Sequence, residues 1–258
     1  MAFFQDVWNI LIQYYPKLLQ GIGNTFLISI IGTLIGLFIG LLNGVIRTIP
    51  DSKNAFVRGI MRVVNWLISA YVEVFRGTPM MVQAMIIFWG YAYMSDGNTL
   101  PLIPAGIAIV SINTGAYITE IVRGGIISID RGQFEGAMAI GMSHGQTMLR
   151  VIIPQVLRNI LPSVSNEFVI NIKDTSVLNV IGVTELYYFA GVIKRQNFQT
   201  FQTYMVVCVL YFIMTFTVTR LLRLIEKKMD GKANYTVFGS QSDSASEIHI
   251  DLEETANG

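Results

Sequence analysis

Residues 25–46 read TFLISIIGTLIGLFIGLLNGVI and contain no charged side chain. A helix rises 1.5 Å per residue, so a helix over this stretch crosses the roughly 30 Å hydrocarbon core of a bilayer. Glycine recurs at every fourth position, which opens a groove on one helix face where a second helix approaches closely. We therefore predict a membrane-spanning helix whose packing groove is formed by Gly32, Gly36, Gly40 and Gly44.

The composition of the whole chain agrees with a membrane protein. Its 258 residues are 52% hydrophobic and 14% charged, with a mean hydropathy of +0.53. Soluble domains carry about 25% charged residues, and so much apolar surface requires lipid as its solvent. The net charge of +1 gives no indication of a nucleic-acid partner. Cys208 is the single cysteine, which excludes a disulfide framework within the chain.

Four further apolar stretches predict an all-α integral membrane protein with about five transmembrane helices. The second stretch, residues 63–93, is longer than the roughly 20 residues that one span needs. It is expected to break at Gly77-Thr78-Pro79, with Thr78 capping the new half-helix. The remaining spans are predicted at residues 102–121, at residues 158–183 with a bend at Pro162, and at residues 203–222, with residues 184–202 as a connector.

The two ends of the chain are predicted to flank this membrane domain, residues 21–228. Residues 1–20 lack the basic start and cleavage site of a signal peptide. They are expected to form an amphipathic leading helix, either in the membrane interface or as the first turns of span one. Residues 229–258 are rich in Ser, Asp and Glu and predict a disordered tail. Lysine and arginine gather after spans one, three and five, which predicts an outside N-terminus and a cytoplasmic C-terminus.

A polar segment, residues 124–157, joins the third span to the fourth and predicts two short helices. Gly141 is expected to end the first helix, because glycine adopts the left-handed backbone conformation at little cost. Ser143 and Gln146 have the spacing of a capping box that starts the second helix. Two short helices at the membrane face indicate a docking element for a partner, and an ordinary solvated loop is the alternative.

The sequence of this segment resembles the EAA loop of ABC importer permeases. The resemblance rests on Glu135-Gly136-Ala137, on the glycine six residues after the glutamate, and on Ile153-Pro154 at the end. Gly136 departs from the family, which usually has alanine at this position. In that family the first short helix lies in a groove of an ATPase subunit. The resemblance therefore implies an ATPase-coupling site formed by Glu135, Gly136, Ala137 and Gly141.

Three other segments resemble the permeases of polar amino acids: residues 72–79 (VEVFRGTP), 115–125 (GAYITEIVRGG) and 173–178 (KDTSVL). Together the similarity extends from about residue 21 to residue 224. It implies the type I importer permease fold and alternating access driven by a dimer of ABC ATPase subunits. It also implies a second permease copy or paralogue and an extracellular or periplasmic amino-acid-binding protein. Glutamine, glutamate, arginine, histidine, lysine and cystine all fit as substrates, and a homodimer and a heterodimer are both consistent with the sequence.

Polar groups at membrane depth are costly to bury, so they mark candidate binding residues. The half-helix after Gly77 has free backbone N–H groups that suit a substrate carboxylate, and a carboxylate such as Glu167 suits an ammonium group. Glu73 and Arg76 lie one turn apart and are expected to pair with each other. Lys173 and Asp174 are adjacent and do not face each other on a helix, so their structural interpretation is pairing with other helices or with the partner subunit. The candidate substrate-binding residues are Gly77, Thr78, Ser111, Asn113, Asn166, Glu167 and Asp174.

No motif predicts catalysis within the chain. The Gly-x-x-x-x-Gly-Lys-Ser/Thr loop that binds ATP phosphates is absent from the sequence, so ATP hydrolysis is expected in a partner chain. No cofactor is expected, and His144 and His249 lack the spaced partners of a metal site. The alternative function is an ion-coupled secondary amino-acid carrier with Glu167 and Asp174 as ion sites. Such carriers usually have internal repeats with two matching broken helices, and this chain has a single predicted break.

Overall fold

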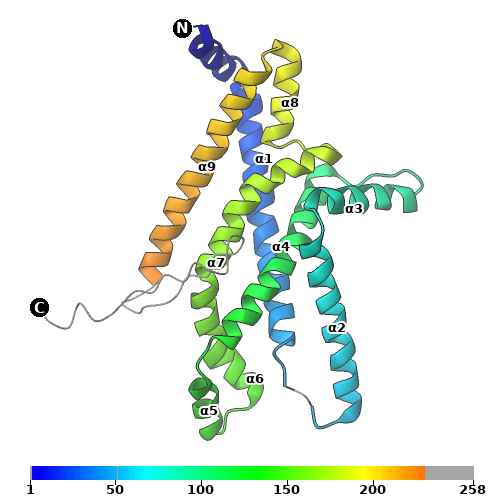
Figure 1. The fold of residues 1–258 in the computed structure, drawn as a ribbon, viewed down its shortest axis with the longest axis vertical. Helices are drawn as coiled ribbons and strands as arrows, with labels where there is room; N and C mark the ends of the chain where they lie inside the picture. Colours follow the sequence, from blue (N-terminus) through cyan, green and yellow to red (C-terminus); the bar gives the residue numbers. More distant parts are fainter. Residues whose placement is uncertain (1, 51, 230–258) are drawn as a thin grey trace, which may run out of the picture.

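A computed structural model describes residues 2–50 and 52–229, and its regular structure there is helical (Figure 1). Four helices are long and apolar enough to cross a membrane: α1 (Ala2–Ile46), α2 (Ala55–Gly77), α4 (Leu102–Ile127) and α9 (Thr200–Met229). A fifth span results if His144–Ile181 and α8 (Leu186–Asn197), which meet at a bend of 56°, are counted as one. This confirms the prediction of an all-α membrane protein with about five spans. The predicted tail, apart from Met229, lies outside the described residues.

Shorter elements connect these spans. Helix α3 (Met80–Met94) follows α2 and extends sideways from the other helices (Figure 1). Helices α5 (Arg131–Ala139) and α6 (His144–Thr147) lie between α4 and α7 (Ile153–Asp174). A π-helical turn, Met148–Ile152, joins α6 to α7, and a 3-10 helix, Thr175–Ile181, follows α7.

The glycine groove of α1 packs on α4, and these two helices make the most extensive helix–helix contact in the described chain. A Cβ atom added at Gly32 would lie 2.6 Å from Val110 Cγ1, and one added at Gly44 would lie 2.5 Å from Val122 Cγ1. No side chain fits at such distances, so the groove allows the two backbones to approach. The predicted role of these glycines in helix packing is confirmed.

A buried polar contact joins three helices. The Asn171 side-chain amide on α7 donates to the Thr33 hydroxyl on α1 at 2.8 Å and lies 3.0 Å from the Thr114 hydroxyl on α4. All three residues are at most 5% exposed. Because lipid offers no competing partners, these hydrogen bonds fix the relative rotation of α1, α4 and α7.

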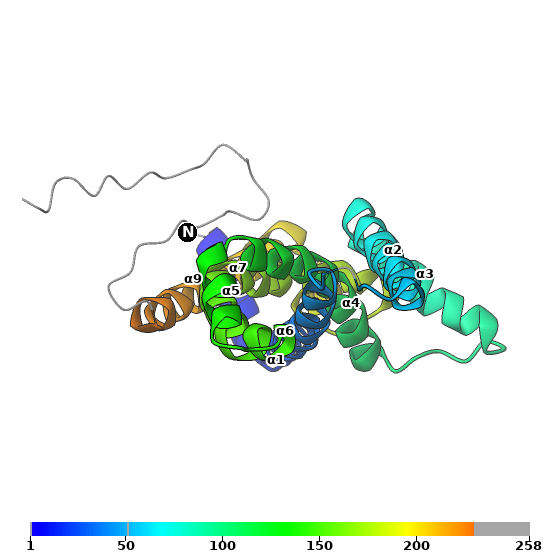
Figure 2. The ribbon, with the colours of Figure 1, turned by 90° about the horizontal axis from the view of Figure 1, so that it is seen from below.

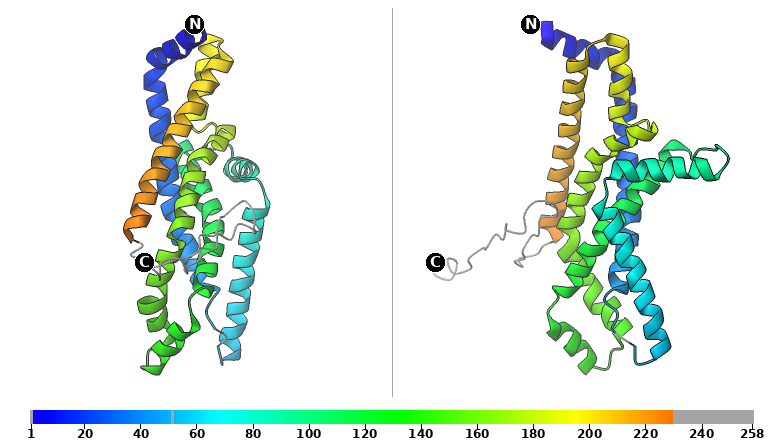
Figure 3. Two further views of the ribbon diagram at one scale, coloured as in Figure 1. Left: turned by 60° about the vertical axis from the view of Figure 1, so that its left-hand side comes forward. Right: turned by 45° about the vertical axis from the view of Figure 1, so that its right-hand side comes forward.

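The helices form an elongated bundle with outlying helices on two sides. Seen from below, α9 flanks one side of the bundle, while α2 and α3 lie on the opposite side (Figure 2). The first turns of α1 are set at an angle to the rest of the helix (Figure 3). Helix α1 contains Pro16, and proline inside a helix is a common cause of such bends.

Two local expectations are corrected by the structure. Thr78 is the C-cap of α2, and Pro79 is the N-cap of α3 with no side-chain hydrogen bond, so Thr78 does not cap the second half-helix. Helix α7 is continuous through Pro162, and irregular turns flank the helix at both ends. The segment predicted as a connector contains α8, whose buried residues recur at helical spacing: Leu186, Phe189, Ala190 and Ile193.

Candidate functional site

Charged and aromatic groups from three helices gather around Tyr117 on α4. The Arg76 guanidinium, from the last turn of α2, lies 5.4 Å from the centre of the Tyr117 ring. Tyr117 also lies within electrostatic range of Glu167 and Asp174 on α7. The groups around Tyr117 thus include one cation and two carboxyl groups, so charges of both signs are available to a zwitterion.

The two carboxyl groups differ in their exposure. Glu167 is 2% exposed, whereas Asp174, at the end of α7, is half-buried. Asn166, adjacent to Glu167 in sequence, is exposed on the surface of the chain. The structure therefore brings Glu167 and Asp174 to the same cluster as Arg76 and directs Asn166 to another face.

The other predicted substrate residues lie at the break between α2 and α3 and on the neighbouring turns of α4. The Thr78 hydroxyl donates to the Val74 carbonyl at 2.7 Å. The Ser111 hydroxyl donates to the Ile107 carbonyl of its own helix at 2.6 Å. The Asn113 amide donates to Gln83 Oε1 at 2.9 Å. Each of these polar groups already has a partner within the chain, and Gly77 is exposed next to them.

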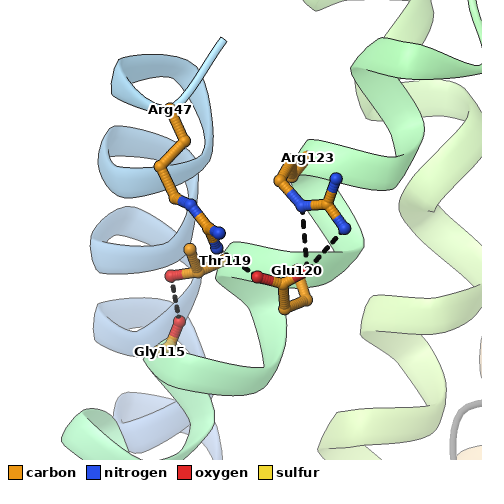
Figure 4. A network of polar contacts seen from close by, with 5 residues as sticks. All are labelled: Arg47, Gly115, Thr119, Glu120 and Arg123. Atoms are coloured by element: carbon orange, nitrogen blue, oxygen red, sulfur yellow. Dashed lines mark hydrogen bonds and ion pairs between the residues drawn. The ribbon is translucent and has the colours of Figure 1, made fainter. Parts of the chain in front are cut away.

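The expected pairing of Glu73 with Arg76 is wrong. Glu120 forms ion pairs instead: it contacts Arg47 at the end of α1 and lies 2.9 Å from Arg123 on α4 (Figure 4). Arg76 instead stacks on Tyr117. Glu120 therefore joins the end of α1 to α4, just before the segment that leads into α5.

The two short helices of the predicted docking segment have the expected caps. Gly141 has φ +82°, and the chain there forms hydrogen bonds from Gly141 N–H to Met138 O and from Met142 N–H to Ala137 O. This is the Schellman arrangement that ends a helix. Ser143 and Gln146 form the capping box that starts α6. Both predictions are confirmed.

Most of α5 is exposed, and the helix packs against α6 and the π-helical turn that follows α6. Glu135, Gly136 and Gly141 are exposed, whereas Ala137 is 6% exposed and faces the chain's own helices. Two large apolar side chains share the exposed surface, Met138 at 58% and Ile140 at 79% exposure. Apolar side chains exposed beside charged ones are typical of a protein-binding surface.

The docking segment is continuous with the core of the membrane domain. Figure 1 places α5 and α6 at one end of the molecule, and Figure 2 shows them under α1 and α7. Ile129, Met148 and Ile152, which flank the two short helices, are at most 7% exposed. They share one apolar cluster with residues of α1, α4 and α7: Leu41, Val45, Ile118, Val122, Val156 and Ile160.

Gln83 and Glu185 are buried polar residues that the sequence did not single out. Gln83 on α3 is 6% exposed and bonds across the helix break. Glu185, 0% exposed, is the N-cap of α8 and accepts hydrogen bonds from Tyr188 N–H at 2.7 Å and from the Tyr211 hydroxyl at 2.5 Å. The apolar spacing of residues 186–193 was the available sign of α8, and Glu185 precedes it in an N-cap position.

Comparison with known proteins identifies relatives across most of the chain. The family model for the binding-protein-dependent transport system inner membrane component matches residues 55–231. The glutamine transport system permease protein GlnP of Escherichia coli (strain K12) is 36% identical over 222 residues, which cover 86% of this chain and 97% of GlnP. The L-cystine transport system permease protein TcyB of Bacillus subtilis (strain 168) is 35% identical over 225 residues, covering 86% and 91%.

Solved structures share the fold. The crystal structure of an amino acid ABC transporter with histidines has a chain that is 34% identical, with a TM-score of 0.72 over 84% of this chain and 96% of its own. The inward-facing MetNI methionine ABC transporter is 19% identical with a TM-score of 0.69, which supports the fold alone. The predicted resemblance to importer permeases is confirmed. This chain belongs to the binding-protein-dependent inner-membrane transport components and is a membrane-embedded permease subunit of an ABC transporter.

Proposed function

We propose that this permease carries a polar amino acid across the membrane by alternating access, driven by a dimer of ABC ATPase subunits. An extracellular or periplasmic binding protein delivers the substrate, and a second permease copy or paralogue completes the pathway. Relatives named for glutamine and L-cystine, and a related structure with histidines, support an amino acid as the substrate. The chain itself performs no catalysis, and ATP is hydrolysed by the partner.

The observation that carries this proposal is the rigid connection between α5 and the membrane helices. Glu135 and Met138 are exposed on α5, while Phe134 of α5 packs against, and the flanking residues Ile129, Met148 and Ile152 belong to, the apolar cluster that also contains residues of α4 and α7. A closely packed interior transmits displacement instead of absorbing it. A partner that moves α5 therefore moves the inner ends of these helices.

The cluster around Tyr117 is the proposed translocation site. The Arg76 guanidinium offers charge-assisted hydrogen bonds to a substrate carboxylate, and Glu167 and Asp174 offer them to an ammonium group. Gly77 and Thr78, at the adjoining helix break, border this site. Because α3 begins at Met80, its free N–H groups add positive potential near the break.

The orientation follows from the basic residues. We place the α5–α6 end of the molecule in the cytoplasm, where the ATPase acts, and the N-terminus outside. Residues 21–228 form the permease domain in this arrangement. The angled first turns of α1, within residues 1–20, then lie along the outer membrane interface.

Reconstitution in proteoliposomes tests the proposal. The permease, its ATPase and its binding protein are incorporated together, and uptake of radiolabelled glutamine, glutamate, arginine, histidine, lysine and cystine is measured with and without ATP. Glu135→Arg should abolish both ATPase binding and uptake, because it reverses the charge on the docking surface. Lys227→Glu is the control, since Lys227 is an exposed residue in the last turn of α9.

The two possible outcomes separate the candidate functions. Uptake that requires ATP and is lost only in Glu135→Arg supports the importer. Uptake that proceeds without the ATPase and follows a proton or sodium gradient would replace it with the ion-coupled carrier.

A further inference from the structure

A single amide side chain satisfies the end of α2 from within α3. The last carbonyl groups of a helix have no partners in that helix. Gln83 Nε2 lies 2.9 Å from the Phe75 carbonyl, from the Thr78 carbonyl and from the Thr78 hydroxyl oxygen. Gln83 is 6% exposed, so these oxygens are bonded within the protein. Its amide therefore joins the two sides of the helix break.

A second amide connects the break to α4. Asn113 Nδ2 donates to Gln83 Oε1 at 2.9 Å and lies 3.4 Å from the Phe75 carbonyl. Asn113 is 9% exposed and lies in the middle of α4. Gln83 thus uses its amide N–H groups as donors and its amide oxygen as an acceptor. Asn113 uses its amide N–H groups as donors to both Gln83 and Phe75. At membrane depth a lost partner has few replacements.

These contacts lie next to the proposed translocation site on both helices: one residue away on α2 and one helical turn away on α4. Arg76 directly follows Phe75, and Tyr117 is four residues after Asn113 on the same face of α4. The contact of Phe75 with Asn113 and the stacking of Arg76 on Tyr117 therefore join the same two helices at neighbouring levels. A change in the first contact displaces the second.

We infer that Gln83 and Asn113 are positioning residues: they form an amide lock that holds the end of α2 against α4 and thereby sets the Arg76 guanidinium over the Tyr117 ring. Asn113 acts in this lock through Gln83 and Phe75, not as a direct ligand of the substrate. The effect of the lock on uptake rests on the proposed function. The effect of the lock on the angle between α2 and α3 is independent of the proposed function.

Spin labels measure the helix break without any need for transport. Val63 on α2 and Ile86 on α3 are 59% and 66% exposed, so both accept a labelled cysteine in a Cys208→Ser background. The labelled chain is diluted into an excess of unlabelled chain, so that distances between copies do not contribute. Gln83→Met and Asn113→Leu preserve side-chain size but remove the amides. Both should broaden the distance distribution between the two labels.

A matched control removes a buried hydroxyl that makes a local bond. Thr119 is 0% exposed on the same helix as Asn113, and its hydroxyl donates to the Gly115 carbonyl at 2.7 Å. Thr119→Val preserves its shape and should leave the label distances unchanged. Unchanged distances in Gln83→Met or Asn113→Leu, or equal broadening in Thr119→Val, would overturn the lock.

Uptake measurements with the same variants test the positioning role. Removing the amide leaves buried oxygens without a donor. This reduces the equilibrium constant that favours the locked arrangement of α2 and α4 by roughly 5-fold or more. The half-saturation concentration for uptake should therefore rise by about that factor, with a smaller change in the maximum rate. If the labels report broadening but the half-saturation concentration stays at the wild-type value, the lock is structural only and the positioning role is wrong. If the wild-type protein shows no ATP-driven uptake, the proposed function fails, and the label distances still decide the lock.

Discussion

A Cβ atom at Gly40 of α1 would lie 2.5 Å from Ile118 Cγ2 of α4. Ile118 is 0% exposed and belongs to a buried apolar cluster, so a shift of its side chain would displace its neighbours. The two helix backbones approach because Gly40 has no side chain. This contact lies in the apolar cluster that also contains the flanks of the docking segment.

Gly40→Ala should therefore destabilise the permease despite the better helix propensity of alanine. Overpacking a close contact costs about 1–3 kcal/mol. The thermal midpoint of the purified protein should fall. Gly23→Ala is the matched control on the same helix, because a Cβ at Gly23 meets no atom within 4 Å. A Gly40→Ala variant as stable as Gly23→Ala would contradict the close contact.

The buried carboxylate of Glu185 should stabilise the junction between the 3-10 helix and α8. Glu185→Ala removes an N-cap worth about 0.5–2 kcal/mol and leaves the Tyr211 hydroxyl without its acceptor. Tyr211→Phe removes the hydroxyl of α9 that donates to Glu185 and leaves the N-cap of α8 in place. Because both variants break the same 2.5 Å hydrogen bond, their costs in the double variant should be less than additive. Chemical unfolding of the four proteins measures this coupling, and strictly additive costs would show that the two residues act independently.

Glu120 should contribute more through Arg47 than through Arg123. Arg47 directly follows α1 and its side chain is 20% exposed, whereas Arg123 is on the same helix as Glu120 and its side chain is 39% exposed. Removing one partner of a partly buried ion pair costs more stability than at the surface and less than in a buried pair. Arg47→Met should therefore lower the free energy of unfolding by about 1–3 kcal/mol. Arg123→Met should cost about 0.5 kcal/mol or less, as for ion pairs within one helix. Thermal unfolding of both variants tests this order, and equal costs would argue against a bridge between α1 and α4.

Local patterns predicted the elements whose cause is local. The glycine spacing of α1, the break at Gly77-Thr78-Pro79, the end at Gly141 and the capping box at Ser143 depend on residues a few positions apart. The roles of Gln83 and Glu185 depend on partners from other helices, such as Asn113 and Tyr211. Local sequence patterns do not identify partners that are 26–30 residues apart, so the amide lock at the helix break could not be predicted.

The expected pair of Glu73 with Arg76 illustrates the same limit. Residues one turn apart on an isolated helix can pair, but the gain is only about 0.2–0.5 kcal/mol. A tertiary contact of comparable or greater energy replaces it, and here the Tyr117 ring lies under the Arg76 guanidinium. The spacing of residues along α2 alone does not show which face of α2 packs on α4.

The stacking of Arg76 on Tyr117 predicts that the aromatic ring, not the hydroxyl, supports uptake. Tyr117→Phe retains the ring and should transport at nearly the wild-type half-saturation concentration. Tyr117→Leu removes the ring face, and a cation–π contact of about 0.5–2 kcal/mol corresponds to a rise of roughly 2- to 30-fold in that concentration. Uptake in proteoliposomes across a range of substrate concentrations distinguishes the two variants. Equal defects in both would assign the role to the hydroxyl, because the ring is present in only one of them.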